Sequence, residues 1–557
     1  MKKFYRYILS AFLFSTAFTA CQKPEYVQPN SEAEIADFYA TLDGDGRGRI
    51  FESTISNDTV YVNIDYYYPI NSDNEVDLTK LLLRASLPVD SRIEPSLEGF
   101  VDLTNPLKVK IIAGNGDTKE YVIVANKKGN TDLISAKLTY EDVVGVTQEL
   151  DAIIIGKEVN FSVIPGTVMK NARITYELNR HAAGSITNGG AVDLTTPKTL
   201  AITSAGNAKT EYRLQAIEAK KLAKGIRPGS AKILFAKKLK GDIGIAVDNV
   251  TGGIAATDQY VVINTRNENS VVLNALTGAK VGEIELGAIK GNLRNFYSTA
   301  DDGGNILVNN LVPSDGNTFN IWKISNINST PNVLISWDAA GSSYGRKISV
   351  IGDVSKNAII TAPLFGLASQ NTMARWEIVN GVVKSQTPTI VTLSGFDWSW
   401  NNADIVYTNP NDVNSDYFAI GYAGNKLTKM NGATNTVSAQ FAGLDANFIS
   451  NAVDYIEFNN SKYVAFTHLN SFTWGAADDA YLIDADGAIS GNVSTASSLV
   501  WAAPKNTYGA LGAQGPANAN ATADIALTKS ANGYFMYMYF MFTNGYVVGV
   551  QFDCVDL

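Results

Sequence analysis

Aromatic side chains stand beside Asp and Asn in two segments of the C-terminal part of this 557-residue chain. One segment runs over residues 396–402 and the other over residues 472–474, and two further rings follow in or beside a long loop over residues 494–520. Flat rings can cover the apolar C–H faces of a sugar, while amides and carboxylates bind its hydroxyl groups. The candidate ligand-binding residues are Asp397, Trp398, Trp400, Asn401, Trp474, Trp501 and Tyr508. The alternative is that these rings pack between sheets as core residues.

Acidic side chains near the ends of the expected strands are the candidates for catalysis. Glycoside hydrolysis needs two carboxyl groups about 5 to 10 Å apart. The acids in question are Asp397, Asp404, Asp454, Glu457, Asp478 and Asp479. Sequence alone places no two of them in one cleft, and solvated loop acids are the default interpretation. We therefore expect a binding protein, with a polysaccharide-cleaving enzyme as an alternative and no catalytic residue assigned.

Metal-binding and nucleophilic patterns are sparse. The two histidines, His181 and His468, fall in different expected domains, and neither belongs to a His-Glu-x-x-His motif. Cys554 lies in an apolar strand, which is typical of an inert buried thiol. The Asp-Gly-Asp-Gly-Arg-Gly run at 43–48 has calcium-loop character, but an arginine occupies its third oxygen position, so a glycine-rich turn is favoured. We expect no metal and no cofactor. The arginines of the C-terminal part, too few to indicate an arginine triad, are Arg266, Arg294, Arg346 and Arg375.

The amino terminus predicts export and lipid attachment. Three basic residues precede the apolar run 8–14, and Phe18-Thr19-Ala20 leads to Cys21. This pattern is typical of a secretory signal over 1–20 and resembles a bacterial lipobox, which implies that Cys21 is lipidated on its sulfur. Residues 21–30 are polar, contain two prolines and predict a tether. We expect an outer-membrane lipid anchor at the cell surface, with a periplasm-facing anchor or an ordinary secreted protein as alternatives.

Composition narrows the classes of partner. The formal net charge is −9, and removal of the three basic residues in 1–20 with the signal takes it to −12. Binding of nucleic acid needs a basic footprint, so nucleic acid is not an expected partner. Twenty-six Tyr, 23 Phe and 46 Gly with only 16 Pro favour strands and tight turns. The sequence therefore predicts an all-β protein.

An internal repeat predicts two tandem domains. Val-Asp-Leu-Thr-x-Pro occurs at 101–106 and again at 192–197, and Glu-Tyr at 120–121 recurs at 211–212. Both pairs are 91 residues apart, which indicates two copies of one domain over 31–128 and 129–228. Residues 59–66 alternate with period two, and short strands at this spacing are typical of immunoglobulin-like β-sandwiches.

A longer repeat follows over residues 229–557. An apolar strand, a turn and another strand recur at intervals of roughly 50 residues, close to the length of a four-stranded propeller blade. Six units predict a six-bladed β-propeller, and the strand at 231–236 is expected to complete the last blade. The apolar run at 534–542 is too short to span a membrane as a helix and predicts a buried strand.

The lipobox, the two Val-Asp-Leu-Thr-x-Pro repeats and the C-terminal propeller with Gly252-Gly253-Ile254 and Asn274-Ala275-Leu276-Thr277-Gly278 together resemble surface lipoproteins of the Bacteroidales. Members with this arrangement are mostly of unknown function. Many accompany glycan-uptake systems, so the resemblance implies a non-catalytic protein that holds polysaccharide at the cell surface. A scaffold for an outer-membrane protein partner is the other alternative, and the oligomeric state stays open.

Overall fold

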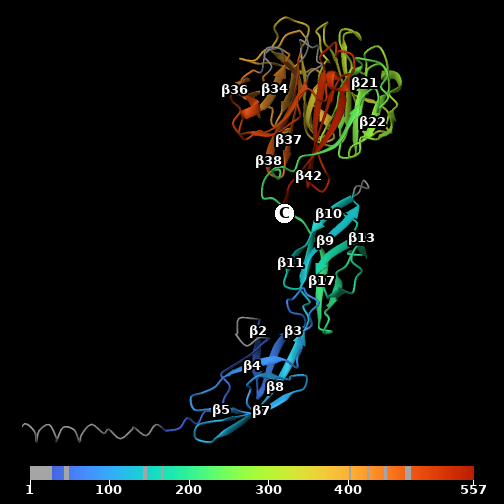
Figure 1. Cartoon of the computed structure of the whole chain (residues 1–557). Coiled ribbons are helices and arrows are strands. Elements are labelled where there is room, and N and C mark those ends of the chain that lie inside the picture. Colours follow the sequence, from blue (N-terminus) through green and yellow to red (C-terminus); the bar gives the residue numbers. More distant parts are fainter. Residues whose placement is uncertain are drawn as a thin grey trace, which may run out of the picture. The chain divides into compact units, whose positions relative to one another are not determined.

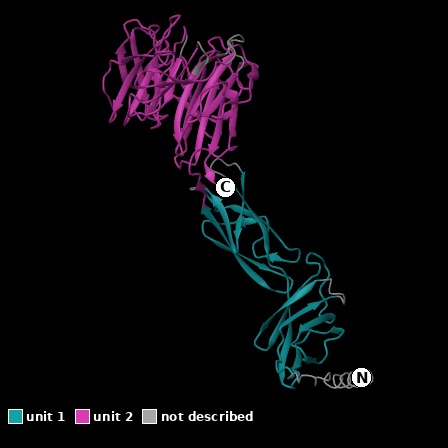
Figure 2. Ribbon diagram, turned by 90° about the vertical axis from the view of Figure 1, so that its left-hand side faces the viewer, with its two compact units in different colours: residues 1–163, 167–217 teal, residues 164–166, 218–557 magenta. Residues whose placement is uncertain are grey.

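The described part of the chain consists of β-strands and connecting loops with almost no helix, as the composition predicts. The computed structural model describes residues 28–42, 49–141, 147–164, 167–400, 403–422, 426–443, 448–470 and 478–556. Clustering of contacts divides the chain into two compact units, unit 1 over 1–163 and 167–217 and unit 2 over 164–166 and 218–557 (Figure 2). The short helical segments in the described residues are η1 (Gly287–Ile289), η3 (Val493–Thr495) and α2 (Ala510–Ala513). None of the described helices is long and apolar enough to cross a membrane.

The first half of unit 1 consists of two groups of strands joined by one shared strand. β2 pairs with β1 near residue 51 and with β3 over 53–56, so it passes from one group to the other. On β3, Val60, Val62 and Ile64 are buried while their neighbours are not, which explains the period of two in the sequence. The strands are β1 (Asp37–Thr41), β2 (Ile50–Ser56), β3 (Thr59–Asp65), β4 (Leu81–Ser86), β5 (Arg92–Glu94), β6 (Phe100–Val101), β7 (Leu107–Ile112) and β8 (Thr118–Lys128).

The second half of unit 1 repeats this arrangement in two separate sheets with their own core. Its hairpin β16–β17 begins 91 residues after the hairpin β7–β8, in line with the sequence repeat. In both copies a tyrosine hydroxyl accepts a backbone N–H, from Ile35 to Tyr121 and from Leu133 to Tyr212. The strands are β9 (Leu133–Glu141), β10 (Thr147–Asp151), β11 (Ile153–Ile155), β12 (Glu158–Val163), β13 (Ala172–Leu178), β14 (Ala183–Gly184), β15 (Gly190–Val192), β16 (Lys198–Thr203) and β17 (Lys209–Glu218).

Unit 2 contains, within its described residues, six antiparallel sheets of four or five strands and one two-stranded pair. Figure 1 shows these sheets in sequence colours from green to red. The two-stranded pair joins β18 (Lys220–Lys221) to β44 (Val555–Asp556). The first three sheets are formed by β20 (Thr251–Ala256), β21 (Tyr260–Thr265), β22 (Ser270–Asn274) and β23 (Lys280–Ile284); β24 (Tyr297–Ala300), β25 (Ile306–Asn309), β26 (Thr318–Ile324) and β27 (Asn332–Asp338); and β28 (Ser349–Gly352), β29 (Ala358–Pro363), β30 (Thr372–Val379), β31 (Val382–Val383) and β32 (Thr389–Thr392).

The last three sheets complete the set. They are formed by β33 (Ala403–Tyr407), β34 (Tyr417–Gly421), β35 (Thr428–Asn431) and β36 (Thr436–Gln440); β37 (Phe448–Phe458), β38 (Ser461–Asn470), β39 (Asp478–Asp484) and β40 (Leu499–Ala502); and β41 (Ala523–Lys529), β42 (Phe535–Phe542), β43 (Tyr546–Asp553) and β19 (Lys232–Lys238). The apolar run near residue 540 is the buried strand β42, and β19 pairs with β43, so the start of the unit completes its last sheet.

The first strands of the six sheets contact one another in a closed cycle. β20, β24, β28, β33, β37 and β41 touch in this order, and β41 touches β20 again. We call these six the inner strands. Because every sheet is an antiparallel meander that starts with its inner strand, the loops between successive sheets lie at the end where the inner strands begin. We call this end of unit 2 the entry end.

Candidate functional site

Trp398 is buried, and its predicted role as an exposed stacking residue is wrong. Its side chain has no exposed area, its indole N–H donates to the carbonyl oxygen of Leu364 at 2.8 Å, and its ring packs against Phe396. Trp398 and Gln370 also exchange two backbone hydrogen bonds of 2.9 and 3.0 Å. Trp398 therefore anchors its loop to the loop between β29 and β30.

Trp400 lies two residues further on and is 59% exposed. The backbone N–H of Trp400 donates to the carbonyl oxygen of Leu367 at 2.7 Å, and the backbone carbonyl oxygen of Trp400 accepts from the N–H of Gly366 at 2.9 Å. Asp397 is exposed and accepts a hydrogen bond from the Ser369 hydroxyl at 3.1 Å. Trp400, Leu367, Asp397 and Ser369 thus form an exposed surface at the entry end, which we call the Trp400 face.

The other candidate rings do not join this surface. Tyr508 is 7% exposed and packs on Phe540 and Tyr546, so its prediction as a ligand-binding residue is wrong. Trp501 is half-buried on β40, where its ring meets the edge of Phe552 at 6.2 Å between centroids, so it belongs mainly to the core. The predicted residues Asn401 and Trp474, and Cys21, lie outside the described residues.

Of the six candidate catalytic acids, Asp404, Asp478 and Asp479 are buried and Asp454 is half-buried, whereas Asp397 and Glu457 are exposed. Asp404 on β33 accepts the backbone N–H of Val453 on β37 at 3.1 Å, and Asp454 on β37 accepts that of Leu527 on β41 at 2.7 Å. Asp478 accepts the N–H groups of Tyr508 and Gly509. Burial raises the pKa of Asp404 and that of Asp478 to about 6. These carboxylates join neighbouring segments, which corrects their interpretation as solvated loop acids.

Asp524 and Lys347 complete this buried network and were missed by the sequence analysis. Lys347, 2% exposed, precedes β28, and its ammonium group lies 2.6 Å from Asp524 and 3.9 Å from Asp404. Asp524 on β41 also accepts the Tyr297 hydroxyl at 2.9 Å and the Ile254 N–H at 2.6 Å. The network thus ties together inner strands from several sheets. No sequence motif distinguishes Lys347 from the exposed lysines of the chain.

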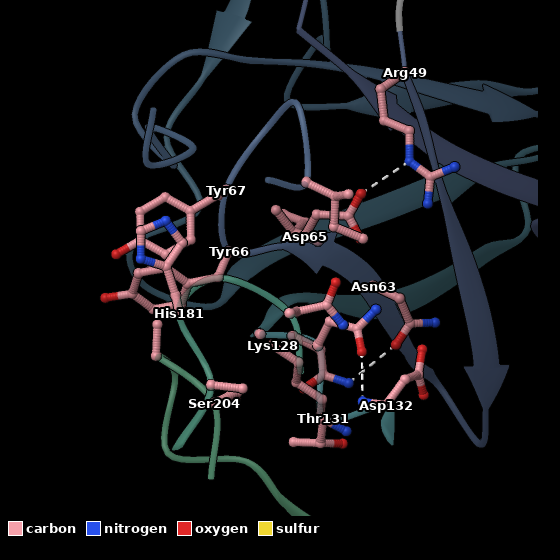
Figure 3. Close-up of a pocket in the computed structure, with 18 of the residues that line it drawn as sticks. Arg49, Asn63, Asp65, Tyr66, Tyr67, Lys128, Thr131, Asp132, His181 and Ser204 are labelled. Atoms are coloured by element: carbon pink, nitrogen blue, oxygen red, sulfur yellow. Dashed lines mark hydrogen bonds and ion pairs between the residues drawn. The ribbon is translucent and has the colours of Figure 1, made fainter. Parts of the chain in front are cut away.

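A polar pocket with a volume of about 490 Å³ lies within unit 1 and is lined by residues from both of its halves (Figure 3). Tyr67 stacks on His181 with ring centroids 3.9 Å apart, and His181 Nε2 lies 2.8 Å from the carbonyl oxygen of Ser72. Arg49 forms an ion pair with Asp65 at 3.0 Å on the opposite side of the pocket. The two contacts of His181 join the halves of unit 1 to each other, whereas Arg49 and Asp65 both belong to the first half.

His468 is fully buried on β38, between Phe466 and Tyr481. Neither of its ring nitrogens has a hydrogen-bond partner among the residues that the structure describes, and burial lowers the pKa of His468 to about 3. In the part of the chain that the structure describes, no group of three or more His, Cys, Asp or Glu side chains is placed to hold a metal ion. Cys554 is a free, buried cysteine.

These observations define an all-β protein of two units, with buried acids at the centre of unit 2 and an exposed tryptophan at its entry end. The family described as "Domain of unknown function (DUF8500)" matches residues 234–553, more than half of the chain, and the chain belongs to this family. A second family, "Domain of unknown function (DUF5018)", matches residues 16–125. Neither description indicates a catalytic activity.

The chain is also similar, at low sequence identity, to a protein of known structure. A DUF4623 family protein from Bacteroides eggerthii is 15% identical, with a TM-score of 0.45, and the match covers 76% of this chain and 98% of that one. No curated protein matches the chain.

Proposed function

We propose that this protein is a lipid-anchored cell-surface protein that binds glycan, without cleaving it, at the entry end of unit 2. In this proposal Cys21 carries the lipid, the two halves of unit 1 are immunoglobulin-like sandwiches, and unit 2 is a six-bladed β-propeller. Two groups of strands in each half of unit 1, joined by the shared strand β2 in the first half and separate in the second, support the first assignment. The cyclic contacts of the inner strands support the second.

The observation that carries the binding proposal is the Trp400 face. A large apolar ring that is 59% exposed can be covered by a partner, and its removal from water would favour binding. A flat indole also fits the C–H face of a sugar ring. The carboxylate of Asp397 and the hydroxyl of Ser369 lie on the same surface and supply hydrogen-bonding groups for sugar hydroxyls. Of the residues expected from the sequence, Asp397 and Trp400 lie on this face, whereas Ser369 and Leu367 were not expected.

The backbone supports the same interpretation. Trp400 has φ of +47°, in the left-handed region, where a bulky residue costs of order 1–3 kcal/mol. Two backbone hydrogen bonds to the 366–367 segment and the buried anchor Trp398 hold this conformation. Strain of this kind persists where surrounding structure imposes it, and here it projects the ring away from the core.

An enzyme is the weaker alternative because three of the six candidate acids already accept backbone hydrogen bonds. Asp404, Asp454 and Asp478 each accept backbone N–H groups, so their use as a base would break a contact between segments. A protein partner that covers Trp400 and Leu367 is the competing outcome of the binding test.

The test is affinity electrophoresis of the mature protein in gels that contain individual soluble polysaccharides. We expect retardation by at least one polymer and a loss of affinity of about tenfold for Trp400→Ala, which corresponds to about 1.4 kcal/mol. The matched control is Phe100→Ala, which removes another exposed aromatic ring, 63% exposed, from unit 1. Absence of binding across the panel, or equal affinities of Trp400→Ala and the wild type, would contradict the proposal.

The anchor has a separate test. Metabolic labelling with a fatty acid should mark the wild-type protein and not Cys21→Ala, and protease treatment of intact cells should remove the labelled chain. Protection of the chain in intact cells would place it on the periplasmic side and contradict surface exposure.

A further inference from the structure

Two arginines reach the entry end from different sheets. Arg266 follows β21 and Arg346 precedes β28. The guanidinium of Arg266 lies 3.9 Å from the ring centroid of Phe296, and its Nε donates to the carbonyl oxygen of Phe296 at 3.3 Å. A Cβ at position 252 would lie 2.9 Å from this Nε, so Gly252 leaves room for the guanidinium.

A continuous series of contacts links these arginines to the Trp400 face. The N–H of Phe296 donates to the carbonyl oxygen of Asn309, and the Asn309 amide donates to the carbonyl oxygen of Gly345, next to Arg346. The guanidinium of Arg346 lies 4.9 Å from the centroid of Phe365, and Phe365 adjoins Gly366, which bonds to Trp400. These contacts connect both arginines, through the segments that hold them, to the segment that bonds to Trp400 at the entry end of unit 2.

Neither arginine has an anionic partner among the described residues. Arg266 is 8% exposed, and its one hydrogen-bond acceptor is the carbonyl oxygen of Phe296. Arg346 is half-buried, and its Nε has no hydrogen-bond partner although it is shielded from solvent. Arg294, at the same end, differs from both because it forms an ion pair with Asp315 at 3.3 Å.

The positive charges of Arg266 and Arg346 are energetically unfavourable without a bound anion. Burial, followed by repulsion from Arg346, lowers the pKa of Arg266 to about 10, so the side chain is still charged at neutral pH. A buried charge without a counter-ion is costly, and the flanking aromatic rings compensate only in part. An anion that bridges the two guanidinium groups would remove this cost, and guanidinium binds carboxylate and sulfate through paired hydrogen bonds.

We propose that Arg266 and Arg346 form an anion subsite that selects glycans with carboxylate- or sulfate-bearing sugars, whose neighbouring rings stack on Trp400. This inference rests on the proposed glycan-binding function and adds the substrate class to it. The negative net charge of the chain disfavours general attraction of polyanions, so binding of an acidic polymer requires a local cationic site.

The experiment compares four polymers with the mature protein: polygalacturonate, the same polymer after reduction of its carboxyl groups, dextran sulfate and neutral dextran. We expect binding to polygalacturonate or dextran sulfate, at least tenfold weaker binding to their uncharged counterparts, and at least a tenfold loss for Arg266→Gln with Arg346→Gln. Arg294→Gln removes the same charge from the same end and should bind as the wild type does. The polymer that binds identifies the anion.

The outcomes separate the two proposals. Equal binding of charged and uncharged polymers, still dependent on Trp400, keeps glycan binding and overturns the anion subsite. Binding of an acidic polymer that the double Gln variant retains also overturns it, and failure of every glycan to bind overturns both. If the Gln variants do not fold, Arg266→Lys and Arg346→Lys keep the charge but lose the paired geometry. Their affinity for the acidic polymer should fall several-fold at unchanged thermal stability, and unchanged affinity would contradict the assignment.

Discussion

Replacement of Lys347 by Met tests the buried network at the centre of unit 2. Met has a similar length and no charge, so the change removes the ammonium group and leaves little cavity. The ammonium group lies 2.6 Å from Asp524 and 3.9 Å from Asp404, and it donates to the carbonyl oxygen of Ala523 at 3.1 Å. After the substitution, two buried carboxylates face each other without a cation.

The expected cost is about 4 kcal/mol in the free energy of unfolding. Removal of one partner from a buried ion pair costs about 3–5 kcal/mol, because the remaining charge stays desolvated. The matched control is Lys384→Met, where the lysine is 57% exposed and pairs with Glu377 at 2.7 Å. A surface pair of this kind contributes about 0–1 kcal/mol, so the two variants should differ by at least 2 kcal/mol.

The stability cost of Lys347→Met should also depend on pH. Burial raises the pKa of Asp404 to about 6 and also raises that of Asp524, and Lys347 opposes both shifts. Without Lys347 these pKa values rise further. An acid with a raised pKa in the folded state binds its proton more tightly there than in the unfolded chain, so acidification stabilises the fold. The cost of Lys347→Met should therefore shrink between pH 7.5 and pH 5.

Urea unfolding followed by tryptophan fluorescence is the suitable assay. All seven tryptophans lie between residues 322 and 501, so their emission reports on unit 2. Lys347→Met with Asp524→Asn should recover part of the lost stability, since one of the unpaired charges is removed. A cost below 1 kcal/mol at pH 7.5, or a cost that does not change with pH, would refute the assignment of this network.

Three further predictions concern single positions. His468→Phe should stabilise the protein by about 2 kcal/mol more at pH 5 than at pH 7.5 in urea melts. The histidine has a pKa of about 3 in the folded state and about 6.5 in the unfolded chain, so stability is lost as the pH falls below 6.5. An equal gain in stability at both pH values would contradict this prediction. Trp398→Ala should cost about 3–5 kcal/mol and Trp400→Ala less than about 1 kcal/mol, and the reverse order in the same melts would disprove the anchor role of Trp398. Asp193→Ala should speed hydrogen exchange at the Thr195 amide, which donates to Asp193 at 3.0 Å, and unchanged exchange would show that this bond adds nothing.

The strands of unit 1 were predictable because each sheet there has one buried and one exposed face. Residues 59–65 alternate between the core and solvent, and β7 shows a similar alternation, with Val109 and Ile111 buried. Inner strands of unit 2 carry no such signal. All six residues of β20 are buried, so a period of two is invisible and only the recurrence of turns indicated the sheets.

The site was less predictable because burial depends on contacts that are distant in sequence. Trp398 and Trp400 lie on either side of Ser399, but backbone hydrogen bonds to residues 366–370 hold one ring inside the protein and the other outside. Lys347 and Arg346 are adjacent in the chain. The lysine lies beside two carboxylates, from β33 and β41, while the arginine has no carboxylate partner among the described residues. The type of a residue determines which interactions it can make. The contacts between separate sheets determine whether it has a partner.

The acids at the centre of unit 2 follow from the same geometry. Inner strands of neighbouring sheets do not share a ladder, so N–H groups at their free edges would lack acceptors. Asp404, Asp454 and Asp524 supply these acceptors to Val453, Leu527 and Ile254 of the next inner strand in the cycle. Each carboxylate is thus used to join two sheets, and a base taken from this set would have to release a strand. Trp400, Arg266 and Arg346, in the loops of the entry end, are not used in such joints, and our proposals therefore place the ligand there.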